Sequence, residues 1–210
     1  MGTREDILRR VRLGLGATPA TDFDAYLAAK AEGPRPEVGA NLVEAFVRKA
    51  EAMASSISVV DRAEDVPAAV RAYLDQRALP RSGCRWPQLA SFDWAAAGIE
   101  TAARAAVDAD KIGLTGAFCG IAETGTLMLL SGPDTPTSVS LLPETHIAVL
   151  PVSRIVAGME DAWKLMRAEC GEPPRSVSFV SGPSRTGDIE MEIVMGIHGP
   201  YRVHIVLYGS

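Results

Sequence analysis

The sequence contains few of the residues that bind a redox metal. Its 210 residues include three cysteines and three histidines. The cysteines, Cys84, Cys119 and Cys170, are odd in number and widely spaced, which argues against a disulfide framework and favours free thiols in a reducing cytoplasm. No CxxC pair occurs, and the histidines are not at HxxxH spacing. We therefore expect neither an iron–sulfur cluster nor a structural zinc, and no cofactor held by this chain.

Long apolar runs and basic clusters are missing as well. Nowhere do about 18 uncharged apolar residues follow one another, as a membrane span would need. The first six residues, MGTRED, lack the positive region of a signal peptide, and no apolar core follows them. The net charge is −5 and Lys and Arg do not cluster, so a nucleic-acid partner is not expected. These features predict a cytoplasmic protein without a membrane span.

The first 36 residues differ in composition from the rest. Apolar residues recur at helical spacing over residues 5–15, behind Thr3 as a possible N-cap, and predict a short amphipathic helix. Residues 16–39 are rich in Ala, Gly, Pro and Asp, with Pro34 and Pro36 as the clearest helix breakers. We therefore expect an N-terminal helical arm and linker over residues 1–36 and one α/β domain over residues 37–210.

Within this domain, short apolar runs alternate with amphipathic segments. Helices are expected at residues 42–53, 63–76 and 154–170. Strands are expected at residues 57–60, 84–86, 111–115, 126–131, 146–151, 177–180 and 202–208. The Ala-rich segment 95–109 could hold a helix end or a loop. The alternation predicts an α/β fold, a mostly parallel sheet with helices on both faces.

Three Gly-rich polar segments interrupt the apolar runs. In the first, residues 120–126, Glu123 could act as a base, a nucleophile or a hydrogen-bond acceptor, and Thr124 and Thr126 could bind substrate. The structural alternative is that Glu123 caps backbone N–H groups. Gly120 and Gly125 would let this segment turn sharply.

The second segment, residues 181–190, follows an expected strand. Its Gly-Pro turn and the run Ser184, Arg185 and Thr186 could direct backbone N–H groups and a guanidinium at a carboxylate or phosphate. Alternatively, Ser184 or Thr186 caps a helix while Arg185 pairs with Asp188 or Glu190. Lys-Ser/Thr is missing, so the segment is not a Walker A motif.

The third segment, residues 196–200, places His198 between glycines, directly before the last expected strand. An imidazole could exchange a proton near neutral pH, although a single histidine in a turn is more often structural. Because loops at the carboxyl ends of parallel strands share one crevice, we expect Glu123, Thr124, Ser184, Arg185 and His198 to converge there. Packing is the default expectation for the other two histidines.

The sequence contains four blocks, IAETGT, SLLPETHIAVL, GPSRTGDIE and GIHGP. Together, and in this order, they resemble the LUD domain of the lactate-utilisation proteins. The resemblance covers about half of the chain, residues 112–207, and is to the short protein C type rather than to the longer protein B type with its Cys-rich ferredoxin-like segments. It implies a fold related to the glucosamine-phosphate isomerase, ribose-phosphate isomerase and CoA-transferase group. It also implies a role beside iron–sulfur protein subunits in oxidising L-lactate to pyruvate.

Fold alone does not decide between functions. The resemblance favours a subunit of a lactate-oxidising system that has no redox cofactor of its own. One alternative is a free-standing isomerase or transferase acting on a small anionic substrate. Another is a non-catalytic assembly or regulatory module.

Overall fold

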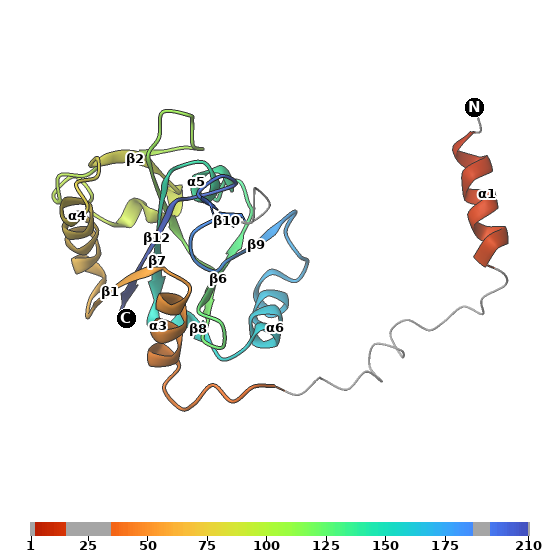
Figure 1. The fold of residues 1–210 in the computed structure, drawn as a ribbon, viewed down its shortest axis with the longest axis horizontal. Helices are drawn as coiled ribbons and strands as arrows, with labels where there is room; N and C mark the ends of the chain where they lie inside the picture. Colours follow the sequence, from red (N-terminus) through yellow and green to blue (C-terminus); the bar gives the residue numbers. More distant parts are fainter. Residues whose placement is uncertain (1–2, 16–34, 187–193, 210) are drawn as a thin grey trace. The chain divides into compact units, whose positions relative to one another are not determined.

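A computed structural model describes residues 3–15, 35–186 and 194–209, and the chain divides into two units, Met1–Arg35 and Pro36–Ser210. In the first unit, α1 (Arg4–Leu15, red in Figure 1) confirms the expected helix. Thr3 N donates to Asp6 Oδ2 at 3.1 Å, and Asp6 N donates in return to Thr3 Oγ1 at 3.4 Å. Thr3 is therefore the N-cap. The remainder of the expected linker, residues 16–34, lies outside the described residues.

The second unit is organised around a six-stranded sheet in which every neighbouring pair of strands is parallel (Figure 1). The expectation of a mostly parallel sheet is confirmed. In spatial order the strands are β1 (Ser56–Val60), β12 (Arg202–Tyr208), β7 (Thr145–Pro151), β4 (Ile112–Gly116), β2 (Ser82–Arg85) and β3 (Glu100–Ala103).

Helices cover both faces of this sheet, because its strands are apolar on both sides. Along β12, Val203, Ile205 and Leu207 pack in one core with α3 (Leu42–Ala52). The intervening Val206 packs in a second core with Leu74 of α4 (Val66–Gln76). Because successive side chains of a strand point to opposite faces of the sheet, β12 contributes alternate residues to the two cores.

A smaller sheet of four strands lies on the α3 side of the main sheet, and α6 (Met159–Cys170) covers its outer face (Figure 1). Its order is β8 (Ile155–Val156), β5 (Cys119–Ile121), β6 (Thr126–Leu130) and β9 (Val177–Val180). Strand β6 is antiparallel to both of its neighbours. The sequence predicted the strand at 126–131 but not this second sheet. A four-residue turn after Ile121 permits only antiparallel pairing.

Two further expectations need correction. The helix predicted from residue 154 begins at Met159, because Ile155 and Val156 form β8 beside β5. The Ala-rich segment 95–109, expected as a helix end or loop, instead contributes the edge strand β3. The short elements are α5 (Ser138–Leu141), β10 (Arg185–Thr186) and β11 (Val194–Met195), together with 3-10 turns at Ala63–Asp65, Pro87–Ser91 and Val152–Arg154. Among the described residues, no helix is both long enough and apolar enough to cross a membrane.

Candidate functional site

The first two predicted segments meet through hydroxyl groups. The turn at 122–125 joins β5 to β6, and β6 pairs with β9, so Thr126 lies beside the residue that follows β9, Ser181. Thr124 Oγ1 donates to Thr126 Oγ1 at 2.8 Å, and Thr126 Oγ1 forms a hydrogen bond with Ser181 Oγ. Because Thr126 is buried, these bonds satisfy a hydroxyl that water does not reach.

Both segments pack against the C-terminal end of α3. Gly125 and Gly182 have positive φ angles of 66° and 80°. A Cβ on Gly125 would overlap the backbone of Ala50, and one on Gly182 would overlap the carbonyl oxygen of Met53. Arg185 Nη2 donates to that same carbonyl oxygen at 3.2 Å. The glycines therefore serve close backbone packing against a helix end.

The third segment joins this region at the amino end of β12. Ser184 N donates to Pro200 O at 3.0 Å, and Gly196 N donates to Ser184 O at 2.9 Å. His198 is exposed in the turn between these two bonds. We call the residues Thr124, Thr126, Ser181, Ser184, Arg185 and His198 the amino-edge cluster.

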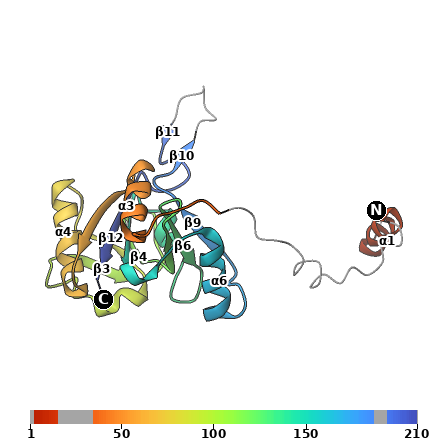
Figure 2. The same ribbon diagram turned by 90° about the horizontal axis from the view of Figure 1, so that it is seen from below.

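The predicted location at the carboxyl ends of the parallel strands is wrong for His198, which precedes β12. Glu123 faces another element: its N donates to Ala157 O at 2.9 Å, and its carboxylate lies beside Gly158 at the start of α6. Arg185 instead contacts the end of α3, beyond which β10 and β11 lie (Figure 2). Glu123 and Arg185 thus contact the ends of two different helices.

In the described part of the second segment, Ser184 does not cap a helix. Arg185 and Thr186 pair with Met195 and Val194 in an antiparallel ladder rather than starting a helix. The acidic partners considered for Arg185, at positions 188 and 190, lie outside the described residues.

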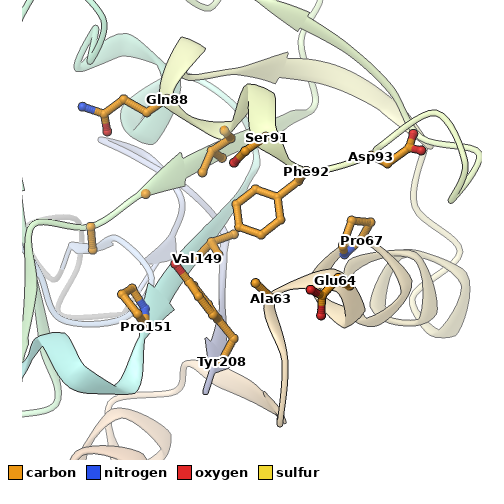
Figure 3. A pocket seen from close by; sticks show the side chains of 13 residues that line it. Ala63, Glu64, Pro67, Gln88, Ser91, Phe92, Asp93, Val149, Pro151 and Tyr208 are labelled. Carbon is orange, nitrogen blue, oxygen red and sulfur yellow. The ribbon is translucent and has the colours of Figure 1, made fainter. Parts of the chain in front are cut away.

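The carboxyl edge of the main sheet carries a cavity of about 560 Å³, which the sequence did not predict (Figure 3). We call it the carboxyl-edge cavity. It lies where β1, β4, β7 and β12 end and where the chain turns after β2. Its lining residues are Ala63, Glu64, Pro67, Gln88, Leu89, Ser91, Phe92, Asp93, Gly116, Ala117, Val149, Pro151 and Tyr208.

The order of the strands explains why a cavity forms there. From β2 the chain moves outward to β3, whereas from β4 it moves the opposite way to β7 and β12. The loops after β2 and β4 therefore diverge and leave a crevice between them, the usual ligand position in open parallel sheets. The segment after β2 was ambiguous in the sequence, so this crevice could not be predicted from it.

Acidic and aromatic groups dominate the chemistry of this cavity. Glu64 is exposed and paired with Arg62, with Nε 3.2 Å from Oε2, and Asp93 Oδ1 accepts from Ala96 N at 3.0 Å. The rings of Phe92 and Tyr208 meet edge to face, 6.0 Å between centroids. None of the residues that line the cavity is basic.

Two other histidines are buried in the sheet, as expected for packing residues. His146 Nε2 bonds with Thr115 Oγ1 at 2.7 Å. The ring of His204 stacks on Tyr73 at 3.8 Å between centroids, and its Nδ1 bonds with Ser56 Oγ at 2.9 Å. Burial lowers the pKa of both His146 and His204 to about 4. Both are therefore neutral structural groups near pH 7.

The cysteines are free, as predicted. Cys84 and Cys119 are buried, and burial raises the pKa of each thiol to about 11. Cys170 is exposed. Within residues 3–15, 35–186 and 194–209, no three His, Cys, Asp or Glu side chains are grouped so that they could hold a metal ion.

Proteins named lactate utilization protein C are similar to parts of this chain. Lactate utilization protein C of Bacillus licheniformis is 38% identical over 129 residues, which are 59% of this chain and 53% of that protein. The protein of the same name from Halalkalibacterium halodurans is 46% identical over 94 residues, 43% of this chain and 41% of that protein. The chain thus spans about half the length of the curated relatives it matches.

A crystal structure of a DUF162 family protein from Deinococcus radiodurans has a similar fold. The TM-score is 0.59 at 21% identity, and the alignment covers 80% of this chain and 96% of that one. The LUD domain matches residues 43–208, which contain the main sheet, the small sheet and both regions described above. Since this match covers well over half of the sequence, the chain belongs to the LUD domain family.

Proposed function

We propose that this chain is a subunit of a lactate-utilisation system and supports the oxidation of L-lactate to pyruvate. The observation that carries the proposal is the similarity, at 38–46% identity, to proteins named lactate utilization protein C. In this proposal the chain holds no redox cofactor. The two electrons removed from lactate pass to iron–sulfur protein subunits that act beside it.

Gene deletion tests the role directly. We expect a strain without this chain to lose growth on L-lactate as sole carbon source while it still grows on pyruvate, and the full chain to restore growth. Consumption of L-lactate by resting cells should fall in parallel. A deletion strain that grows on and consumes L-lactate at the parental rate would disprove the proposal.

Partner subunits are tested by purification from lactate-grown cells. The tagged chain should bring iron–sulfur proteins with it, detected as iron and acid-labile sulfide in the eluate and identified by mass spectrometry. The matched control is the untagged chain, expressed in the same cells and carried through the same purification. Equal iron in both eluates, or none in either, would contradict a specific complex.

If the chain itself binds lactate, the amino-edge cluster is the place we propose. Arg185 is exposed and gives one N–H to Met53 O. A guanidinium has five donors, so beside this bond to a described residue it has further N–H groups with which to hold a carboxylate in a bidentate fork. Thr124, Ser184 and Thr186 would bind substrate hydroxyls, and His198 would serve as a proton-transfer group. Thr126 would only position Thr124 and Ser181, because it is buried and bonded to both. Glu123, whose carboxylate lies beside Gly158, would act there only if the substrate extends to the start of α6.

Titration of L-lactate followed by calorimetry tests this binding. Because Arg185 is exposed, Arg185→Ala should weaken binding by only about two- to ten-fold. Arg185→Lys should recover part of the loss, because an ammonium cannot reproduce the fork. Arg62→Ala, which removes an exposed arginine elsewhere, serves as the control. Equal affinity in all four proteins would exclude Arg185 as the anion site.

The same variants separate the subunit from the alternatives. A non-catalytic assembly module should show no L-lactate binding in the calorimetric titration, with Arg185 in place or replaced. A free-standing isomerase or transferase acting on an anion would need a basic group at its site. The residues that line the carboxyl-edge cavity include Glu64 and Asp93 but no basic residue, so that cavity does not favour this function.

A further inference from the structure

The carboxyl-edge cavity is lined by acidic, aromatic and apolar residues and by no basic residue. Its volume of about 560 Å³ lies within the range of small-molecule sites, roughly 300–1,000 Å³. It lies at the divergence of the loops after β2 and β4, where parallel sheets bind ligands. Position and size thus indicate a binding site, and the lining side chains indicate the chemistry of its ligand.

The aromatic pair forms the middle of the cavity. Figure 3 shows the rings of Phe92 and Tyr208 between Glu64 and Asp93 on one side and Gln88 and Pro151 on the other. Pro67 and Val149 add apolar surface. An aromatic face attracts a cation, and its edge packs against another ring. This part of the cavity fits a small organic cation that contains a ring or a short apolar chain.

The charged groups favour the same ligand. Glu64 and Asp93 both line the cavity, and both side chains are exposed. Arg62 pairs with Glu64 but does not itself line the cavity, and Asp93 uses Oδ1 to cap Ala96 N. An ammonium or amidinium could therefore bond to the remaining carboxylate oxygens, whereas a carboxylate such as lactate would be repelled.

We propose that the carboxyl-edge cavity binds a small organic cation, a primary amine or amidine attached to an apolar group, between the Phe92 and Tyr208 rings and the Glu64 and Asp93 carboxylates. This site is separate from the amino-edge cluster and does not depend on the lactate role. A chain that fails to bind lactate can still bind the cation, and the reverse holds as well.

A matched pair of probes tests the charge. Benzylamine and benzoate have the same ring and opposite charge. Benzylamine should bind in a titration followed by amide NMR, with the largest shifts at Phe92, Asp93, Ala117 and Tyr208. Benzoate should bind at least about five-fold more weakly, since exposed carboxylates contribute only modest energies. Equal binding of the two probes, no binding of benzylamine, or shifts confined to the amino-edge cluster would overturn the proposal.

Variants locate the interaction. Glu64→Gln and Asp93→Asn should each weaken benzylamine binding by about two- to five-fold, and the second keeps an oxygen for Ala96 N. Phe92→Leu should have an effect of similar size through loss of the ring. Glu44→Gln removes an exposed carboxylate from α3 as the control. If Glu64→Gln and Asp93→Asn bind benzylamine as the unmodified chain does, the carboxylates are not the site. Circular dichroism should show an unchanged fold in every variant.

Discussion

The two edges of the main sheet are built in opposite ways. At the amino edge, Gly125 and Gly182 bring two turns into backbone contact with α3, and a chain of hydroxyls joins β6 to the end of β9. At the carboxyl edge, diverging loops leave a cavity of about 560 Å³. Glycine-rich polar motifs therefore mark tight packing in this molecule, whereas the open site results from strand order.

Replacing a glycine by alanine at each edge of the sheet should give the largest expected difference in stability. Gly125→Ala should lower the free energy of unfolding by about 2–5 kcal/mol, from left-handed strain and overlap with Ala50. Gly116→Ala should change it by less than about 1 kcal/mol, because a Cβ there meets Gln88 and Leu89 only at 3.8–4.0 Å. Urea unfolding measures both. Equal losses at the two positions would disprove the difference in packing.

Acid should weaken the amino half of the sheet, where His146 and His204 are buried near the starts of β7 and β12. Burial lowers the pKa of each to about 4, below an unfolded value of about 6.5. Between these values the unfolded chain binds protons that the folded chain does not, so stability falls as pH falls. Each imidazole should contribute about 1.4 kcal/mol per pH unit.

Urea unfolding at pH 4.5, 5.5 and 7.5 checks this slope. In His204→Gln, the part of the slope that belongs to one histidine should disappear, leaving about half of the effect. The two rings lie on opposite faces of the sheet, since Val203 pairs with His146 and the next residue is His204, so their contributions should add. An unchanged slope in His204→Gln would mean that His204 is not the titrating group.

The local pattern of apolar and polar residues was enough to predict many of the helices and strands. The apolar run of β12 and the run of β9 end at polar or Gly residues, so the predicted bounds 202–208 and 177–180 agree with the structure. The pairing of β6 with β5 was not predictable in the same way, because β5 has only three residues. The carboxyl-edge cavity depends on which strands are neighbours, and periodicity does not contain that information.

Removing a hydroxyl from the chain that joins Thr124, Thr126 and Ser181 should lower stability by less than Gly125→Ala does. Thr126→Val keeps the shape of the buried side chain but removes its bonds to Thr124 and Ser181, and should cost about 1–2 kcal/mol. Ser91→Ala, at the exposed rim of the cavity, should change stability by no more than about 0.5 kcal/mol. Thermal unfolding monitored by circular dichroism compares them. A Thr126→Val protein as stable as Ser91→Ala would show that the hydroxyl chain does not stabilise the pairing of β6 with β9.

Replacing Arg185 should have the smallest effect on stability. Measuring stability and growth of the same variant therefore distinguishes a structural role of Arg185 from a role in binding. Its bond to Met53 O is exposed and 3.2 Å long, so Arg185→Ala should cost no more than about 1 kcal/mol. Arg62→Ala, at the carboxyl edge, should cost about as little, because its ion pairs are exposed too. If urea unfolding shows that both variants are stable but only Arg185→Ala loses growth on L-lactate, Arg185 acts on a ligand or partner. A loss above about 2 kcal/mol in Arg185→Ala would instead make it a structural clamp between β10 and α3.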